Sequence, residues 1–314
     1  MRDVLRIAYD IMPGAGEDSY ALRSDEQGAF LCVTDGCGGL GSRRYEMFEN
    51  RTGAYIASRL ASGAFASWAE ECRPAPRSAQ EVQILCRELE NDLFHRLKGF
   101  ADIHCCQEKT RITGSMQKTL PTTLCAFTAY EDQDCFWWAG DSRGYLLDED
   151  GLHQYTRDHS RGEWDAFEML YRDAPLQNLL SADSMGQVQC RRVQIRKPSV
   201  AVIATDGVYS ALPSPMEVEM LLLDTLRAAG SFVGWGRRLD KLIRTNAQDD
   251  ATLLMLPLGA GSFAEWKEAI LPRRETLQKQ FITPLRRHKG DLAYAREKWN
   301  AYRQGYDRTE TEDE

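Results

Sequence analysis

The chain has 314 residues, of which 43% are hydrophobic, and a formal net charge of −8. This composition can fill the core of one large domain or two ordinary ones, so we expect a globular protein and not a disordered one. The negative charge argues against nucleic acid or an anionic membrane as the main partner, because both require a basic surface. The sequence has no apolar stretch of about 18 residues and no signal-peptide core, which predicts a cytoplasmic protein without membrane contact.

The first part of the chain is predicted to contain strands followed by helices. A first strand is expected over residues 3–11, and a hairpin over residues 20–33, whose polar loop ends in Gly28. Apolar residues then recur at helical spacing over residues 43–72 and 78–102. These two helices are expected to cover one face of a sheet.

Strands return in the middle of the chain. Four short strands with tight turns are predicted over residues 122–130, 135–139, 144–147 and 152–155. Short connections between consecutive strands favour an antiparallel meander. The polar residues 160–186, with short helical stretches over 164–171 and 176–180, are predicted to form a flap beside a site.

The last part of the chain repeats the order of strands and helices. Strands are expected over residues 187–195, 200–205 and 251–256, and helices over residues 214–229 and 232–245. The whole order predicts an α+β fold in which two stacked antiparallel sheets lie between pairs of helices. We expect a main domain over residues 1–258 and a helical extension over residues 259–314, which ends in a disordered acidic tail.

Four predicted strands begin or end at aspartates. These residues are Asp35, Asp141, Asp206 and the pair Asp249 and Asp250. The predicted hairpin adds Glu17 and Asp18, since the start of one antiparallel strand lies beside the end of the next. Carboxylates gathered in one place repel each other unless a cation lies between them, and Mg²⁺ and Mn²⁺ prefer oxygen ligands. The pattern therefore predicts a carboxylate-bound metal centre.

The motifs around these acids, taken in order, resemble those of the metal-dependent serine/threonine phosphatases of type 2C, including the bacterial ones. The matching segments are Glu17 and Asp18, residues 33–39 (Val-Thr-Asp-Gly-Cys-Gly-Gly), residues 122–124, residues 140–143 (Gly-Asp-Ser-Arg), residues 156–160, residues 205–207 (Thr-Asp-Gly) and residues 249–252. The resemblance covers residues 10–256 and implies a four-layer αββα sandwich.

The resemblance also implies roles for the acids. Asp35 is expected to bridge two Mn²⁺ or Mg²⁺ ions, to which Gly36 contributes its carbonyl group, and Asp206 and Asp249 are expected to hold the first ion. Glu17 and Asp18 would serve the second ion, and Asp141 would join Asp206 at a weaker third one. The implied activity is hydrolysis of phosphoserine and phosphothreonine on proteins by a metal-activated water, with Asp35, Asp206 and Asp249 as the catalytic residues. The implied partner is a phosphorylated protein in a system with a cognate serine/threonine kinase.

Two positions depart from the family pattern. The arginine that usually precedes the acidic pair and binds phosphate is missing, and Arg6, Arg43 and Arg44 are the candidates to replace it. Cys37 stands where some relatives have a histidine. We expect Cys37 not to be a nucleophile, because an acidic site disfavours the thiolate.

Two other interpretations account for part of the pattern. Gly36, Gly38 and Gly41 also fit a dinucleotide-binding G-x-G-x-x-G pattern, but no second parallel strand ending in an acid follows. A scaffold that binds phosphoproteins without turnover is the alternative function, favoured by the missing arginine and disfavoured by the retained acids. The nine cysteines are odd in number and form no C-x-x-C pair, so we expect reduced thiols.

Overall fold

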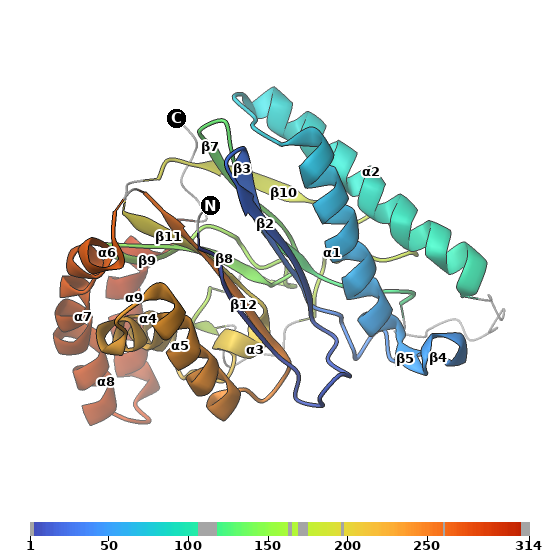
Figure 1. Cartoon of the computed structure of the whole chain (residues 1–314). Coiled ribbons are helices and arrows are strands. Elements are labelled where there is room, and N and C mark those ends of the chain that lie inside the picture. The colour runs from blue at the N-terminus through green and yellow to red at the C-terminus, as the bar shows by residue number, and fades with distance from the viewer. Residues whose placement is uncertain are drawn as a thin grey trace.

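The fold is a sandwich of two five-stranded antiparallel sheets with helices on both outer faces (Figure 1). The structure is a computed structural model, which describes residues 3–105, 118–162, 165–168, 175–195, 198–259 and 261–308. The predicted α+β class and the four-layer αββα arrangement are confirmed.

The first sheet has the strand order β10-β7-β6-β3-β2. Its strands are β2 (Ser19–Asp25), β3 (Gly28–Thr34), β6 (Leu124–Tyr130), β7 (Gln133–Ala139) and β10 (Gln189–Val193). Helices α1 (Gly53–Cys72) and α2 (Ala79–His104) cover its outer face.

The second sheet has the strand order β1-β12-β11-β8-β9. Its strands are β1 (Leu5–Tyr9), β8 (Arg143–Asp148), β9 (Gly151–Gln154), β11 (Ser199–Ala204) and β12 (Ala251–Leu258). Its outer face is covered by α4 (Pro215–Ala228), α5 (Phe232–Asn246) and the C-terminal helices, while the one-turn helix α3 (Asp206–Tyr209) follows β11.

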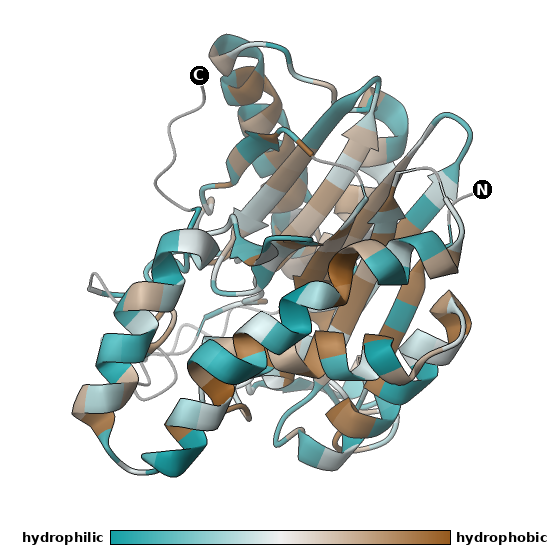
Figure 2. Ribbon diagram, turned by 90° about the vertical axis from the view of Figure 1, so that its left-hand side faces the viewer, coloured by the Kyte–Doolittle hydropathy of each residue, from teal (hydrophilic) through white to brown (hydrophobic). Residues whose placement is uncertain are grey.

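The strands are buried on both faces, which explains their nearly continuous apolar sequences. In β3, Leu31 and Val33 face the other sheet, whereas Phe30 and Cys32 face the helices. This alternation follows from the two-residue period of a strand. Figure 2 shows the same division, with largely hydrophobic strands inside and helices that are hydrophilic on their outer surface. Fully burying a side chain of this size contributes about 1.5–3 kcal/mol, so the strands hold the layers together.

The segment before α1 differs from the sequence prediction, which placed a helix from residue 43 onward. Residues 44–52 form a small two-stranded ribbon made of β4 (Arg44–Tyr45), the 3₁₀ turn η1 (Glu46–Phe48) and β5 (Arg51–Thr52). The helix begins only at Gly53, because the Thr52 hydroxyl accepts a hydrogen bond from the Tyr55 amide and caps the helix there.

The predicted meander is also wrong, because its four strands are divided between the sheets. The chain leaves the first sheet at Gly140, whose φ of +105° suits glycine, and enters the second sheet at β8. The turn between β6 and β7 and the turn between β8 and β9 are hairpin turns, as predicted. The crossing places Asp141 between the two sheets.

The predicted flap contains no helix over residues 176–180. Leu180 instead forms an extended bridge with Thr122, and Asn178 exchanges hydrogen bonds with the backbone of Gln187. Residues 165–168 form a turn, and the remainder of the predicted helical stretch 164–171 lies outside the described residues.

The C-terminal segment is helical as predicted. It comprises α6 (Phe263–Ile270), α7 (Pro272–Leu277), the π-helical η3 (Gln278–Ile282), α8 (Thr283–Arg287) and α9 (Leu292–Tyr306). Its buried residues belong to the same core as the outer face of the second sheet; they are Trp266, Ile270, Leu277, Phe281, Ile282, Trp299, Tyr302 and Tyr306. The domain boundary at residue 258 remains a prediction, and the acidic tail 309–314 lies outside the described residues.

The helix α9 is tied to the segment 165–168. The indole N–H of Trp299 donates to Asp165 at 2.8 Å, and the Arg296 guanidinium donates to Asp165 and Glu168 at 3.0 and 2.9 Å. The Trp299 ring stacks on Phe167. Among the described helices, none is long and apolar enough to cross a membrane.

Candidate metal centre

The end of β3 brings the first three acids together. Ser19 pairs with Thr34, and the Gly36 amide donates to the Glu17 carbonyl oxygen at 3.3 Å. Glu17 and Asp18 therefore lie beside Asp35, at the same edge of the first sheet, as the hairpin pattern predicted.

The end of β11 brings the second group of acids to the same place. Thr205 and Thr252 are joined by three hydrogen bonds, at 3.0, 2.9 and 3.4 Å, which hold Asp206 beside the start of β12. The Thr205 hydroxyl also donates to Asp18 Oδ2 at 2.7 Å. This bond links the acids of the two sheets directly.

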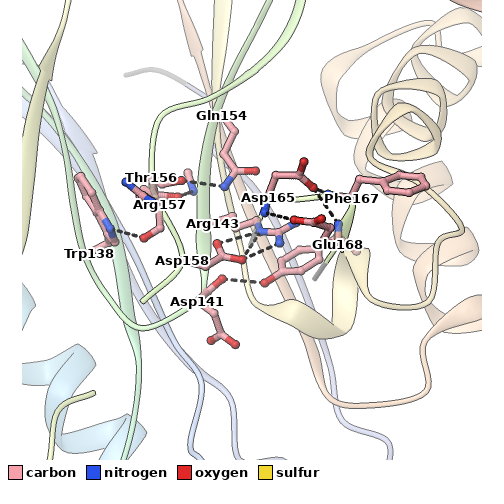
Figure 3. Close-up of polar contacts among 12 residues, drawn as sticks. Trp138, Asp141, Arg143, Gln154, Thr156, Arg157, Asp158, Asp165, Phe167 and Glu168 are labelled. Atoms are coloured by element: carbon pink, nitrogen blue, oxygen red, sulfur yellow. Dashed lines mark hydrogen bonds and ion pairs between the residues drawn. The ribbon is translucent and has the colours of Figure 1, made fainter. Parts of the chain in front are cut away.

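Asp141 reaches the centre from the crossing between the sheets. The Tyr209 hydroxyl donates to the Asp141 carbonyl oxygen at 2.7 Å. Figure 3 shows Asp141 with Arg143 and Asp158, which are joined to each other, beside it. The Arg143 guanidinium is 4.0 Å from the centre of the Tyr209 ring. It also donates to Asp158 at 3.0, 3.2 and 2.6 Å.

The acids influence each other strongly. Burial raises the pKa of Asp35 well above its usual value, and the charges of Asp206, Asp18, Asp141 and Asp249 raise it further. These are five of the seven acidic residues that the sequence predicted, and the effect of their charges on Asp35 indicates that they lie close together.

Three of the acids around Asp35 also have raised pKa values. Burial, with a smaller contribution from Asp206, raises the pKa of Asp18 to about 8 and that of Asp141 to about 7. The pKa of Asp206 is raised by burial and then by Asp249. Carboxylates in this state gain most from a bound cation, because it would offset both burial and repulsion.

Glu17 lies at the rim of the cluster. Its pKa is raised by burial and by Asp250 and Asp249, while Thr52 and Arg44 act in the opposite direction. The Thr52 hydroxyl donates to Glu17 Oε1. Thr52 thus caps α1 and orients an acid of the site at once, a role that the sequence did not reveal.

The donors fit a hard divalent cation in their chemistry, since all of them are oxygens. In the described part of the chain, no three acidic, histidine or cysteine side chains already have a metal-ligating arrangement. Proximity and charge therefore define the centre, and the individual ligand assignments remain predictions.

The glycines of the loop after β3 are explained by close packing. A Cβ on Gly36 would lie 2.4 Å from the Ala54 carbonyl oxygen, and one on Gly38 would lie 2.1 Å from Glu17 Oε2. The glycine spacing that also fits a dinucleotide motif thus serves to pack this loop against α1 and Glu17.

Asp250 has a role that sequence reasoning did not identify. Its carboxylate accepts hydrogen bonds from the amides of Ile11 and Glu17 at 2.8 and 2.7 Å. It therefore fixes both ends of the loop that leads into the acidic pair. The adjacent aspartate, Asp249, is the one whose charge acts on Asp35 and Asp206.

Cys37 lies in the site but is poorly suited to nucleophilic attack. Burial raises its pKa well above the usual value, and the charge of Asp35 raises it further. The thiol is therefore protonated near neutral pH, in agreement with the sequence expectation.

The structure distinguishes the three arginines considered for phosphate binding. Arg6 donates to the Tyr20 hydroxyl at 2.6 Å, and Arg43 lies 5.5 Å from the centre of the Tyr45 ring. Arg44 is the candidate whose charge acts on Glu17.

Several solved structures share this fold, among them bacterial serine/threonine phosphatases. They include the serine/threonine phosphatase Stp1 from Staphylococcus aureus, with 17% identity, a TM-score of 0.60 and coverage of 83% of this chain and 96% of that one. The serine/threonine phosphatase PstP/Ppp from Mycobacterium tuberculosis shares 17% identity, with a TM-score of 0.57 and coverages of 82% and 99%. PppA of Pseudomonas aeruginosa, described as a key regulatory component of the T6SS, shares 18%, with a TM-score of 0.56 and coverages of 81% and 96%. At these identities the likeness shows the fold.

The family follows from the sequence itself. A sequence model described as protein phosphatase 2C matches residues 15–244, which include every predicted acid of the centre except Asp249 and Asp250. The chain belongs to the protein phosphatase 2C family. A comparison with curated proteins gave no match.

Proposed function

We propose that this protein hydrolyses phosphoserine and phosphothreonine on proteins in a reaction that depends on Mn²⁺ or Mg²⁺. The observation that supports this most is the cluster in which Asp35 interacts with Asp18, Asp141, Asp206 and Asp249, which come from both sheets. A site of this charge is suited to divalent cations and, through them, to a phosphate group.

The ligand roles follow the family pattern at matching positions. Asp35 would bridge two ions with the help of the Gly36 carbonyl, and Asp206 and Asp249 would hold the first of them. Glu17 and Asp18 would serve the second ion, and Asp141 would join Asp206 at a third. When bound, these ions supply an attacking water with a lowered pKa and neutralise charge on the phosphoryl oxygens.

The chain itself orients the acids for this task. Thr205 holds the carboxylate of Asp18, and Thr52 holds that of Glu17. Tyr209 holds the Asp141 backbone from the other side of the site. The protonated Cys37 offers no competing nucleophile. Water would therefore attack the phosphorus directly, without a covalent enzyme intermediate, and the P–O bond to the serine or threonine oxygen would break, with that oxygen taking its proton from water.

The substrate, the partner and the cellular location are also part of the proposal. We infer a phosphorylated protein substrate, a cognate serine/threonine kinase that forms it, and a cytoplasmic location. A scaffold that binds phosphoproteins without turnover is the second candidate, favoured by the lack of any arginine or lysine in residues 10–16.

A turnover assay separates the two candidates. The purified protein should release phosphate from a phosphothreonine peptide with Mn²⁺ or Mg²⁺, lose this activity in EDTA, and regain it when the ion is restored. Binding of the peptide without phosphate release, at saturating metal, would favour the scaffold.

A further inference from the structure

We propose that Arg44, on the ribbon of residues 44–52, binds the phosphate group of the substrate. The inference rests on the proposed function. It identifies a replacement for the phosphate-binding arginine that is missing before Glu17 and Asp18. The acid cluster repels a phosphate dianion, so a cationic side chain beside it would help to hold the substrate.

The ribbon places Arg44 on the side of the acid centre. Arg44 pairs directly with Thr52 across the two strands. Residues paired in this way project to the same face, with Cβ atoms about 4.5–5.5 Å apart. Because the Thr52 hydroxyl donates to Glu17, the Arg44 side chain stands on the face of the ribbon that meets Glu17.

The Arg44 guanidinium keeps hydrogen-bonding capacity for a ligand. The residue is exposed, and one of its N–H groups donates to the Asn50 carbonyl oxygen at 2.9 Å. Within the described residues it forms no ion pair with a carboxylate. Its planar fork can therefore offer parallel N–H groups to two phosphate oxygens.

The turn of the ribbon supports this arrangement. Glu49 and Asn50 have φ values of 53° and 59°, in the left-handed region that non-glycine residues seldom adopt. This local conformation turns the Asn50 carbonyl toward Arg44. The guanidinium is thus anchored at one end, which lowers the entropy that it loses when it binds a ligand.

Two neighbouring arginines have structural contacts instead. Arg51 donates to the Gly14 carbonyl oxygen and lies 4.6 Å from the centre of the Tyr55 ring. Arg59 donates to the Gly16 carbonyl oxygen at 2.9 Å and to the Tyr55 carbonyl oxygen at 3.1 Å. Both hold the loop before Glu17 against α1 and so help to position this acid.

Three other arginines are also held by contacts of their own. Arg143 is 1% exposed and paired with Asp158, so a substrate does not reach it. Arg6 lies against the Tyr20 ring and Arg43 against the Tyr45 ring. Arg44 is therefore the candidate that lies on the side of Glu17 and has an exposed guanidinium with N–H groups left to bind phosphate.

The test compares Arg44→Ala and Arg44→Lys with Arg43→Ala, a matched control that removes the same charge one residue away. Binding of inorganic phosphate is measured by calorimetry in saturating Mg²⁺, and kcat and KM are measured with a phosphothreonine peptide. A charge-assisted hydrogen bond corresponds to a change of roughly ten- to hundredfold in affinity. We expect a loss of that size in phosphate affinity, and a matching rise in KM, for Arg44→Ala.

The controls make the result decisive. Arg44→Lys should recover part of the affinity, Arg43→Ala should stay within about twofold of the wild type, and Mg²⁺ binding should be the same in all variants. Phosphate binding that is unchanged in Arg44→Ala, equally weakened in Arg43→Ala, or absent from the wild type would overturn the proposal. If the wild type binds phosphate but does not hydrolyse the peptide, the proposed function fails while the comparison of phosphate affinities still tests Arg44.

Discussion

Replacing Asp158 by asparagine should destabilise the protein strongly, because it removes the charge that balances a buried arginine. Arg143 is 1% exposed and makes three contacts with Asp158 of 2.6–3.2 Å. Although burial disfavours the charged guanidinium, Asp158 holds the pKa of Arg143 well above its usual value. The variant therefore keeps a buried positive charge without its counter-charge, which costs about 3–5 kcal/mol in comparable sites.

Urea unfolding of the metal-free protein, followed by tryptophan fluorescence, measures this loss. A lowered midpoint with an unchanged slope would show that stability itself has fallen. The matched control is Asp25→Asn, which removes an acid from the exposed pair with Arg23, at 2.7 Å, and should hardly move the midpoint. The double variant Arg143→Met with Asp158→Leu should recover most of the loss, since neither charge remains buried. Equal midpoints for Asp158→Asn and Asp25→Asn would refute this reasoning.

The other predictions concern the centre and the C-terminal helices. Asp206→Asn should abolish turnover yet raise the metal-free melting temperature, because it relieves repulsion among buried carboxylates; a sharply lower melting temperature would show that Asp206 is structural. Cys37→Ser should keep kcat within about threefold, whereas its complete loss with metal still bound would make the thiol a participant. Gly38→Ala should weaken metal binding in calorimetry, because its Cβ would lie 2.1 Å from Glu17 Oε2, and unchanged binding would show that Glu17 is not needed there. Truncation after Leu258 should give an insoluble or unfolded chain by circular dichroism, since it exposes the core under α6–α9; a soluble, active product would show that these helices are dispensable.

The strands and the acid cluster could be predicted because their signals are local. Each strand is a short apolar run, and each acid stands at the end of one of them. The polar loop of the hairpin also fixed the register that brings Glu17 and Asp18 beside Asp35. These features need no knowledge of distant contacts.

The errors arose where the structure depends on contacts that residue spacing alone does not indicate. Tyr45 and Phe48 have helical spacing, yet they lie on the ribbon. Thr52 pairs with Arg44 to form the ribbon and caps α1, so the helix cannot begin earlier. The strands on either side of Asp141 are local hairpins, and only packing between the sheets assigns them to different ones. The role of Asp250 likewise depends on the backbone of Ile11 and Glu17, more than 200 residues away.

The dependence of the initial rate on Mn²⁺ concentration, measured with a phosphothreonine peptide, tests the central claim most directly. The wild type should show a rate that rises from zero and saturates with Mn²⁺. Asp35→Asn, which alters the acid on which acids from both sheets act, should show no rate at any concentration. A rate that is independent of the metal, or one that survives in Asp35→Asn, would contradict the assignment of this cluster as the catalytic metal centre.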